Sequence, residues 1–209
     1  MKTLLLSLVM TLLLSGCMKE ELLLPSTDLT GGTWKSQCLS GTLATGAPAH
    51  LQLTMTFDGT NQVMETTAYS SSNCTGSKLL GSTERYGYVV GGASSYNTDA
   101  IEIDYTLQSI TAVVYSSSVA TDFNNQSYCG TSTWTVGQAK NIEGLTCGTS
   151  TVPTAGTVSY DIYEIVKIVD ISSGAGSGDL LIGMSDGTYD GSTPAKRHRY
   201  TAPIYFTKN

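Results

Sequence analysis

Residues that could support acid/base catalysis are few in this chain. Glu102 and Asp104 alternate in one extended segment, so their carboxyl groups would share a face about 7 Å apart. That separation suits an inverting glycosidase pair. The same face continues with Thr106 and Gln108, a composition typical of the solvent side of a sheet. We therefore expect a solvated surface at Glu102 and Asp104.

Nucleophilic catalysis has equally little support. The chain contains no GxSxG sequence, and only His50 and His198 could serve as imidazole bases. We interpret both histidines as solvated surface residues. A hydrolase with a site assembled from scattered residues would need a cavity that holds His50, His198 or a pair of acids.

Two glycine-rich regions share only part of a ligand-loop pattern. Residues 174–178 read Gly-Ala-Gly-Ser-Gly but lack the helix and the final glycine of a dinucleotide loop. Asp186-Gly187 and Asp190-Gly191 lack the alternating ligands and the late glutamate of a calcium loop. We expect turns in these regions, and we predict neither a metal nor a cofactor.

The first seventeen residues carry the strongest chemical signal. After Lys2, the leucine-rich residues 4–14 are followed by Ser15, Gly16 and Cys17. Eleven helical residues would span about 17 Å, well short of the roughly 30 Å hydrocarbon core of a bilayer. This length favours a signal segment over a permanent anchor.

Two small residues followed by a cysteine resemble the bacterial lipobox, whose thiol takes a diacylglycerol before cleavage. The resemblance implies that residues 1–16 are removed and that Cys17 tethers the protein to a membrane of the cell envelope. An ordinary signal peptide with a coincidental cysteine is the alternative. Met18 stands where an aspartate would retain a lipoprotein in the inner membrane, so we expect the outer membrane of a diderm bacterium.

The charge of the remaining chain limits its partners. Without residues 1–16, 193 residues remain, with 10 Lys and Arg against 17 Asp and Glu, a formal charge of −7. Nucleic acids and anionic lipid headgroups require a basic surface, so we expect neither as a partner.

Four further cysteines remain in a chain expected in an oxidising compartment, which favours two disulfides. Three pairings are possible. We favour Cys38 with Cys74 and Cys129 with Cys147, because each pair brackets one local strand and loop unit. A zinc site is the rival interpretation, but no CxxC occurs.

These residues must be positioned by strands, since the chain from residue 31 onward is rich in Thr, Ser, Tyr, Val and Gly and alternates with period two. Asp58-Gly59 predicts a hairpin turn, and a slip in the apolar pattern predicts a bulge near Ser109. Val119 and Phe123 predict one or two helical turns over 118–124. The expected strands are 32–40, 51–58, 61–69, 84–90, 101–108 continuing to 114, 131–136, 157–168, 179–184 and 204–207.

This pattern predicts an all-β domain, either an antiparallel up-and-down barrel of about eight or nine strands or a β-sandwich. We divide the chain into a signal segment (1–16), a lipidated tether (17–30) and a single domain (31–209).

Gly32 and Trp34 open the first expected strand, and Arg197 and Arg199 precede the last. This arrangement resembles the lipocalin and wider calycin pattern, in which a GxW tryptophan packs at the closed end of an eight-stranded barrel under a late arginine. The resemblance implies that Trp34 is buried beneath Arg199, or beneath Arg197, and that a ligand enters from the opposite end.

The leading functional hypothesis is a non-enzymatic, lipid-tethered barrel that binds an apolar or amphipathic small molecule or presents loops to an unidentified protein partner. A structural or adhesive surface lipoprotein with a filled barrel is the alternative, and the hydrolase is third. The candidates for lining a ligand space are the inward positions Leu53, Met55, Phe57, Ile103 and Tyr105.

Growth with labelled palmitate is expected to label the protein, and Cys17→Ser should abolish the label and release the protein from membranes. Several acyl chains anchor firmly, whereas one binds only marginally. Gradient fractionation should place the wild type with outer-membrane markers. A serine variant that stays membrane-bound through washes would contradict the tether.

Overall fold

The computed structural model describes residues 29–156, 162–169 and 179–208, and most of their regular structure is β-strand. None of the helices in these ranges is long and apolar enough to cross a membrane. In chain order the elements are β1 (Thr33–Ser36), β2 (Leu39–Thr42), β3 (Pro48–Phe57), β4 (Asn61–Tyr69), β5 (Lys78–Ala93), β6 (Ile101–Val114), α1 (Ser117–Asn125), η1 (Tyr128–Gly130), β7 (Ala139–Asn141), β8 (Thr146–Cys147), β9 (Ser150–Thr151), β10 (Ile162–Val169), β11 (Asp179–Met184), η3 (Pro194–Lys196) and β12 (Tyr200–Lys208).

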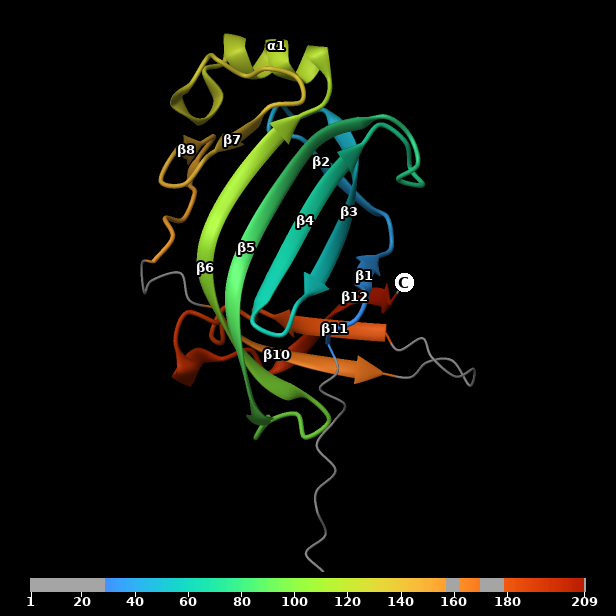
Figure 1. The fold of residues 1–209 in the computed structure, drawn as a ribbon, viewed down its shortest axis with the longest axis vertical. Coiled ribbons are helices and arrows are strands. Elements are labelled where there is room, and N and C mark those ends of the chain that lie inside the picture. Colours follow the sequence, from blue (N-terminus) through green and yellow to red (C-terminus); the bar gives the residue numbers. More distant parts are fainter. Residues whose placement is uncertain (1–28, 157–161, 170–178, 209) are drawn as a thin grey trace, which may run out of the picture.

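Eight of the strands form a closed antiparallel barrel, which confirms the predicted fold class (Figure 1). Around the barrel the order is β1, β3, β4, β5, β6, β10, β11 and β12, which is the order of the chain. β1 closes the ring because it pairs with β12 on one side and with β3 on the other. The up-and-down topology is therefore as expected.

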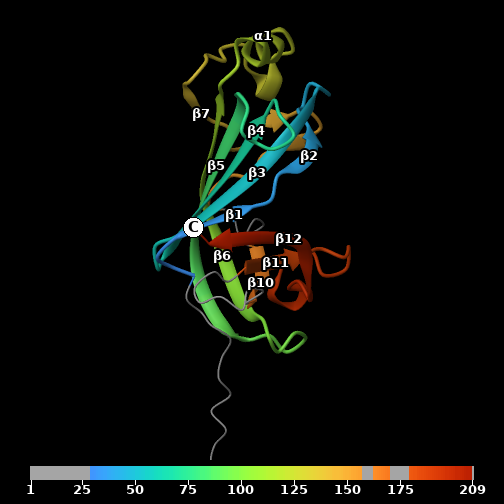
Figure 2. The same cartoon turned by 90° about the vertical axis from the view of Figure 1, so that its right-hand side faces the viewer.

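Closure covers only part of the long strands. β1 pairs with residues 54–56 of β3, whereas residues 48–51 of β3 pair with β2. Figure 2 shows β3 to β6 rising out of the barrel, away from β10 to β12. Here they form an open sheet, with β2 along one edge and β7 along the other. We call α1, η1, β8, β9 and their connecting segments the cap.

The barrel and the open sheet have separate cores. In the barrel core an indole, two phenyl rings, two phenol rings and aliphatic side chains fill the interior. In the second core the cap packs on the open sheet. The barrel core contains Leu29, Trp34, Met55, Phe57, Tyr86, Ile101, Ile103, Tyr105, Leu107, Ile110, Val166, Leu180 and Phe206. The second contains Leu43, Ala49, Ala68, Ala112, Val114, Val119, Ala120, Phe123, Cys129 and Trp134.

Several local predictions are confirmed. Asp58 turns the chain between β3 and β4 by accepting hydrogen bonds from the backbone N–H groups of Thr60 and Asn61. The register between β5 and β6 shifts beside Ser109, as expected for a bulge. α1 buries the faces of Val119 and Phe123.

The strand expected at 131–136 is wrong. The backbone of Trp134 is held by the side chain of Asn124, which accepts a hydrogen bond from the Trp134 N–H and donates one to its carbonyl oxygen. The segment joins no sheet ladder. Its alternating sequence has strand propensity, but contacts with α1 determine its conformation.

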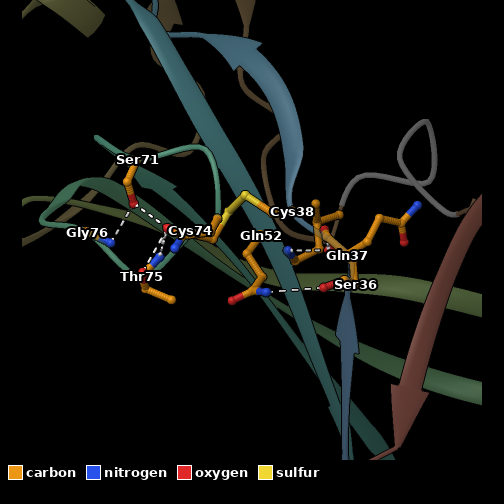
Figure 3. The surroundings of a disulfide bond; sticks show 10 residues. Ser36, Gln37, Cys38, Gln52, Ser71, Cys74, Thr75 and Gly76 are labelled. Atoms are coloured by element: carbon orange, nitrogen blue, oxygen red, sulfur yellow. Dashed lines mark hydrogen bonds between the residues drawn. A yellow bond between two sulfur atoms is a disulfide. The ribbon is translucent and has the colours of Figure 1, made fainter.

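Both predicted disulfides are present, Cys38–Cys74 and Cys129–Cys147. The first ties the junction of β1 and β2 to the loop after β4 (Figure 3). In that loop, Ser71 accepts a hydrogen bond from the Gly76 N–H. The second disulfide closes 18 residues of the cap, which contributes about 3 kcal/mol in the chain-entropy model.

Trp34 lies in the barrel core with only 1% of its surface exposed, and its indole donates a hydrogen bond to the Leu29 carbonyl. The cation over its ring is Lys208, 5.3 Å from the centroid. Arg199 lies elsewhere, because β12 pairs antiparallel with β1 and brings Lys208 opposite Trp34. The start of β12 is about 27 Å away at roughly 3.4 Å per residue. The expectation of an arginine above Trp34 is therefore corrected.

Trp34→Ala is expected to lower the free energy of unfolding by about 3 to 5 kcal/mol, as large truncations in cores do. Denaturant unfolding followed by circular dichroism measures this loss. Lys208→Met is the comparison variant, since it replaces the half-buried cation beside the ring with an uncharged side chain of similar length, and it should cost less than about 1 kcal/mol. Equal losses for the two variants would show that Trp34 does not anchor the closure.

Candidate functional site

A cavity lies between the open sheet and the cap, outside the closed barrel. It has a volume of about 220 Å³, more than the roughly 150 Å³ of an engineered cavity that binds benzene. We call it the groove. Its walls are mainly aliphatic and aromatic: Thr42, Leu43, Ala44, Leu51, Thr66, Ala68, Leu80, Gly81, Ser82, Ala112, Phe123, Tyr128, Cys129, Trp134, Ile142, Cys147 and Val152.

Three aromatic rings of the cap form one wall of the groove. The ring centroid of Phe123 lies 4.2 Å from that of Tyr128 and 5.3 Å from that of Trp134. The Trp134 indole donates a hydrogen bond to the Tyr128 carbonyl. With Asn124 holding its backbone, Trp134 is fixed at both ends. This wall is therefore preorganised in the absence of a ligand.

One cation stands beside this wall. Lys140 Nζ lies 5.2 Å from the centre of the Trp134 ring and donates hydrogen bonds to the hydroxyls of Thr131 and Thr133. Lys140 is the register partner of Ala112, which lines the groove. Among the described residues no carboxylate forms an ion pair with Lys140. An apolar groove with a cation beside it suits an amphipathic anion.

Inside the barrel lies a smaller space, with a volume of about 110 Å³. We call it the chamber. Of the five residues expected to line a ligand space, Met55 and Tyr105 line it. Phe57 and Ile103 belong to the packed core, and the half-buried Leu53 packs against it, because bulky side chains fill most of the interior of an eight-stranded barrel. The other chamber residues are Gln62, Met64, Tyr86, Glu164 and Ile182.

The chamber contains buried polar groups. Gln62 is 4% exposed and Tyr105 is 6% exposed, and Glu164 Oε2 is buried and has no hydrogen-bond partner among the described residues. The Tyr86 hydroxyl donates a 2.5 Å hydrogen bond to Glu84. Burial, followed by the negative charge of Glu164, raises the pKa of Tyr105 well above its ordinary value. Burial and the Glu84 charge raise the pKa of Tyr86 as well.

Glu164 and His198 form a buried ion pair beside the chamber, with 3.0 Å between Oε1 and Nδ1. The contact with Glu164 raises the pKa of His198, although burial opposes the shift. Gly183 makes room for the pair, since a Cβ there would overlap the Glu164 carboxylate and the His198 ring. His198 is thus buried, and the prediction of a solvated residue is wrong for it. Sequence reasoning missed Glu164 altogether.

Glu102 and Asp104 lie on the solvent side of β6, as predicted, with side chains 31% and 47% exposed, and both form ion pairs with Arg197. Arg197 Nε lies 3.2 Å from a Glu102 oxygen, and Nη1 lies 2.6 Å from an Asp104 oxygen. The same guanidinium donates hydrogen bonds to the carbonyls of Ile103 and Glu164. These contacts fix the loop between β11 and β12 against the barrel wall.

Arg199 has a separate role in the same loop. Its guanidinium lies 3.6 Å from the ring centre of Tyr96 and 3.4 Å from that of Tyr189. It therefore joins the loop between β5 and β6 to the loop between β11 and β12. Gly32, expected to open the first strand, lies just before β1, which begins at Thr33.

The other candidates lie apart from both cavities. His50 pairs in register with Ser40 and Tyr69 and lines neither cavity. Asp186 and Asp190 accept hydrogen bonds from nearby backbone N–H groups, which confirms the turns. Within the described ranges no three His, Cys, Asp or Glu side chains gather as a metal site would require. Cys17 and residues 174–178 lie outside the described residues.

No protein-family model matches the chain, and no curated protein matches it.

The Glu164–His198 pair is expected to make stability depend on pH. The folded-state pKa of His198 is raised. The contribution of the pair to the free energy of unfolding is therefore complete below about pH 6.5, and it is lost as the pH rises through the raised pKa. The neighbouring Asp190 stays charged throughout, since Ser192 holds its pKa at about 2. The wild type should therefore lose its stability advantage over His198→Gln as the pH rises from about 6.5 through the raised pKa of His198. A difference in denaturation midpoint that does not change with pH would contradict this.

Proposed function

We propose that this protein is a lipid-anchored, lipocalin-like barrel of the bacterial cell envelope, held in the outer membrane through Cys17, that binds a small amphipathic molecule in the groove. The observation that carries the proposal is the groove itself, a space of about 220 Å³ with aliphatic and aromatic walls. Ligand sites are typically concave, mainly apolar and formed in advance.

The groove suits the proposal better than the barrel interior does. Its volume is about 220 Å³ against about 110 Å³ for the chamber. The cap closes over it with Trp134 held rigidly. A ligand with a short alkyl or aryl group would replace water on these walls, and its anionic group would face Lys140.

A filled barrel also fits the alternative of a structural or adhesive lipoprotein. The packed residues Phe57 and Ile103 favour it, because they leave the barrel little room for a ligand. The two functions differ in what they require of the groove. A structural protein needs no ligand there.

Hexanoate is expected to bind in the groove and to shift the ¹⁹F resonance of Trp134 in protein labelled with 5-fluorotryptophan. The chain has 2 tryptophans, so Trp34 in the barrel core serves as the internal reference. Ala112→Leu should weaken binding about tenfold, because the ligand would lose about two buried methylenes at roughly 0.8 kcal/mol each.

Val113→Leu is the matched control, since Val113 is the next residue of β6 and does not line the groove. It should leave the affinity unchanged. 1-Hexanol should bind more weakly than hexanoate if Lys140 contributes. A shift at Trp34 alone, or equal affinities for the two leucine variants, would contradict the proposal.

A further inference from the structure

We propose that the chamber inside the barrel is a second binding site, specific for a small organic ammonium ion. The inference concerns a different ligand and a different cavity from the groove, so neither depends on the other. It rests on the size of the chamber, on its hydrogen-bond acceptors and on the charge around it.

Size limits the occupant. The chamber has a volume of about 110 Å³, below the roughly 150 Å³ that accommodates benzene. An occupant therefore has no more than about six non-hydrogen atoms. Met55, Met64 and Ile182 provide apolar contacts for an alkyl group of that size.

The chamber contains hydrogen-bond acceptors that an added donor could satisfy. Glu164 Oε2 is buried and has no hydrogen-bond partner among the described residues, and Glu164 lines the chamber. The Tyr86 hydroxyl donates its hydrogen bond to Glu84 and retains a lone pair that can accept another. Buried polar groups without partners are costly, and an ammonium group carries N–H donors that would satisfy them.

Charge selects an ammonium ion over a neutral alcohol. Glu164 lines the chamber. Glu84 accepts a hydrogen bond from the hydroxyl of Tyr86, which also lines the chamber. His198 pairs with Glu164, but no cation pairs with Glu84 in the part of the chain that the structure describes. Among the described residues, no lysine or arginine lines the chamber. The rings of Tyr86 and Tyr105, with centroids 5.7 Å apart, add two faces that attract a cation.

Three molecules with one carbon skeleton test the charge requirement: isobutylammonium, isobutanol and isobutyrate. The readout is the ¹³C-methyl spectrum of methionine in the purified full-length protein. Met55 and Met64 line the chamber, whereas Met184 is 41% exposed on β11 and is the internal reference. Isobutylammonium should shift the first two resonances in a saturable manner and bind at least about tenfold more tightly than isobutanol.

Variants test the residues. Glu84→Gln should weaken isobutylammonium binding about tenfold. Glu65→Gln, an equal change of charge at an exposed position of β4, should have no effect. Gln62→Leu is a second variant that keeps Glu84 and removes the amide acceptor, and it should also weaken binding.

Three results would overturn the proposal. The first is the absence of any saturable shift at Met55 and Met64, which would mean that the chamber holds only water. The second is equal binding of isobutanol, which would make it a purely apolar cavity. The third is an equal effect of Glu84→Gln and Glu65→Gln in folded proteins, which would attribute binding to overall charge.

Discussion

The pairing of β1 with both β3 and β12 is the constraint on which the rest of the structure depends. β1 has only four residues, and Trp34 within it fills the barrel core. A closing strand this short can seal only a short barrel. The much longer β5 and β6 therefore extend beyond the closed part and expose an apolar face, which must be covered by something other than another barrel strand.

The cap provides that cover, and its construction differs from that of the barrel. α1 contributes Val119, Ala120 and Phe123 to the second core, while the segment after α1 follows an irregular path. Ser127 and Cys129 have positive φ angles, a conformation that non-glycine residues rarely adopt. The disulfide between Cys129 and Cys147 and the Asn124 contacts with Trp134 hold this path. A helix and a loop cover a curved sheet less completely than neighbouring strands do, and the groove is the space that remains.

Patterns that depend on near neighbours could be predicted from the sequence. The hairpin at Asp58-Gly59 and the bulge beside Ser109 follow from local alternation and turn residues. The sequence allows three disulfide pairings, and the favoured one, in which each pair brackets a local unit, is present. Partners distant in the sequence could not be predicted in the same way. The cation over Trp34 depends on the register of β12 against β1. The contact between Glu164 and His198 depends on how β10, β11 and β12 pair with one another.

The same limit applies to the candidate site. Alternation correctly placed Met55 and Tyr105 inside the barrel, but it carries no information on how much space the neighbouring side chains leave. The groove residues, such as Leu80 and Phe123, come from segments that look like ordinary core in the sequence. Because β1 is much shorter than β6, this part of the core lies outside the closed barrel, between the open sheet and the cap. Sequence alternation does not show where a closed sheet becomes an open one.

The central claim is that the apolar ligand lies between the open sheet and the cap and not within the barrel. Intermolecular nuclear Overhauser effects between bound hexanoate and the methyl groups of the protein test it most directly. They are expected at Ala68, Leu80 and Ala112, which line the groove. Contacts confined to Met55 and Met64, which line the chamber, would contradict the claim.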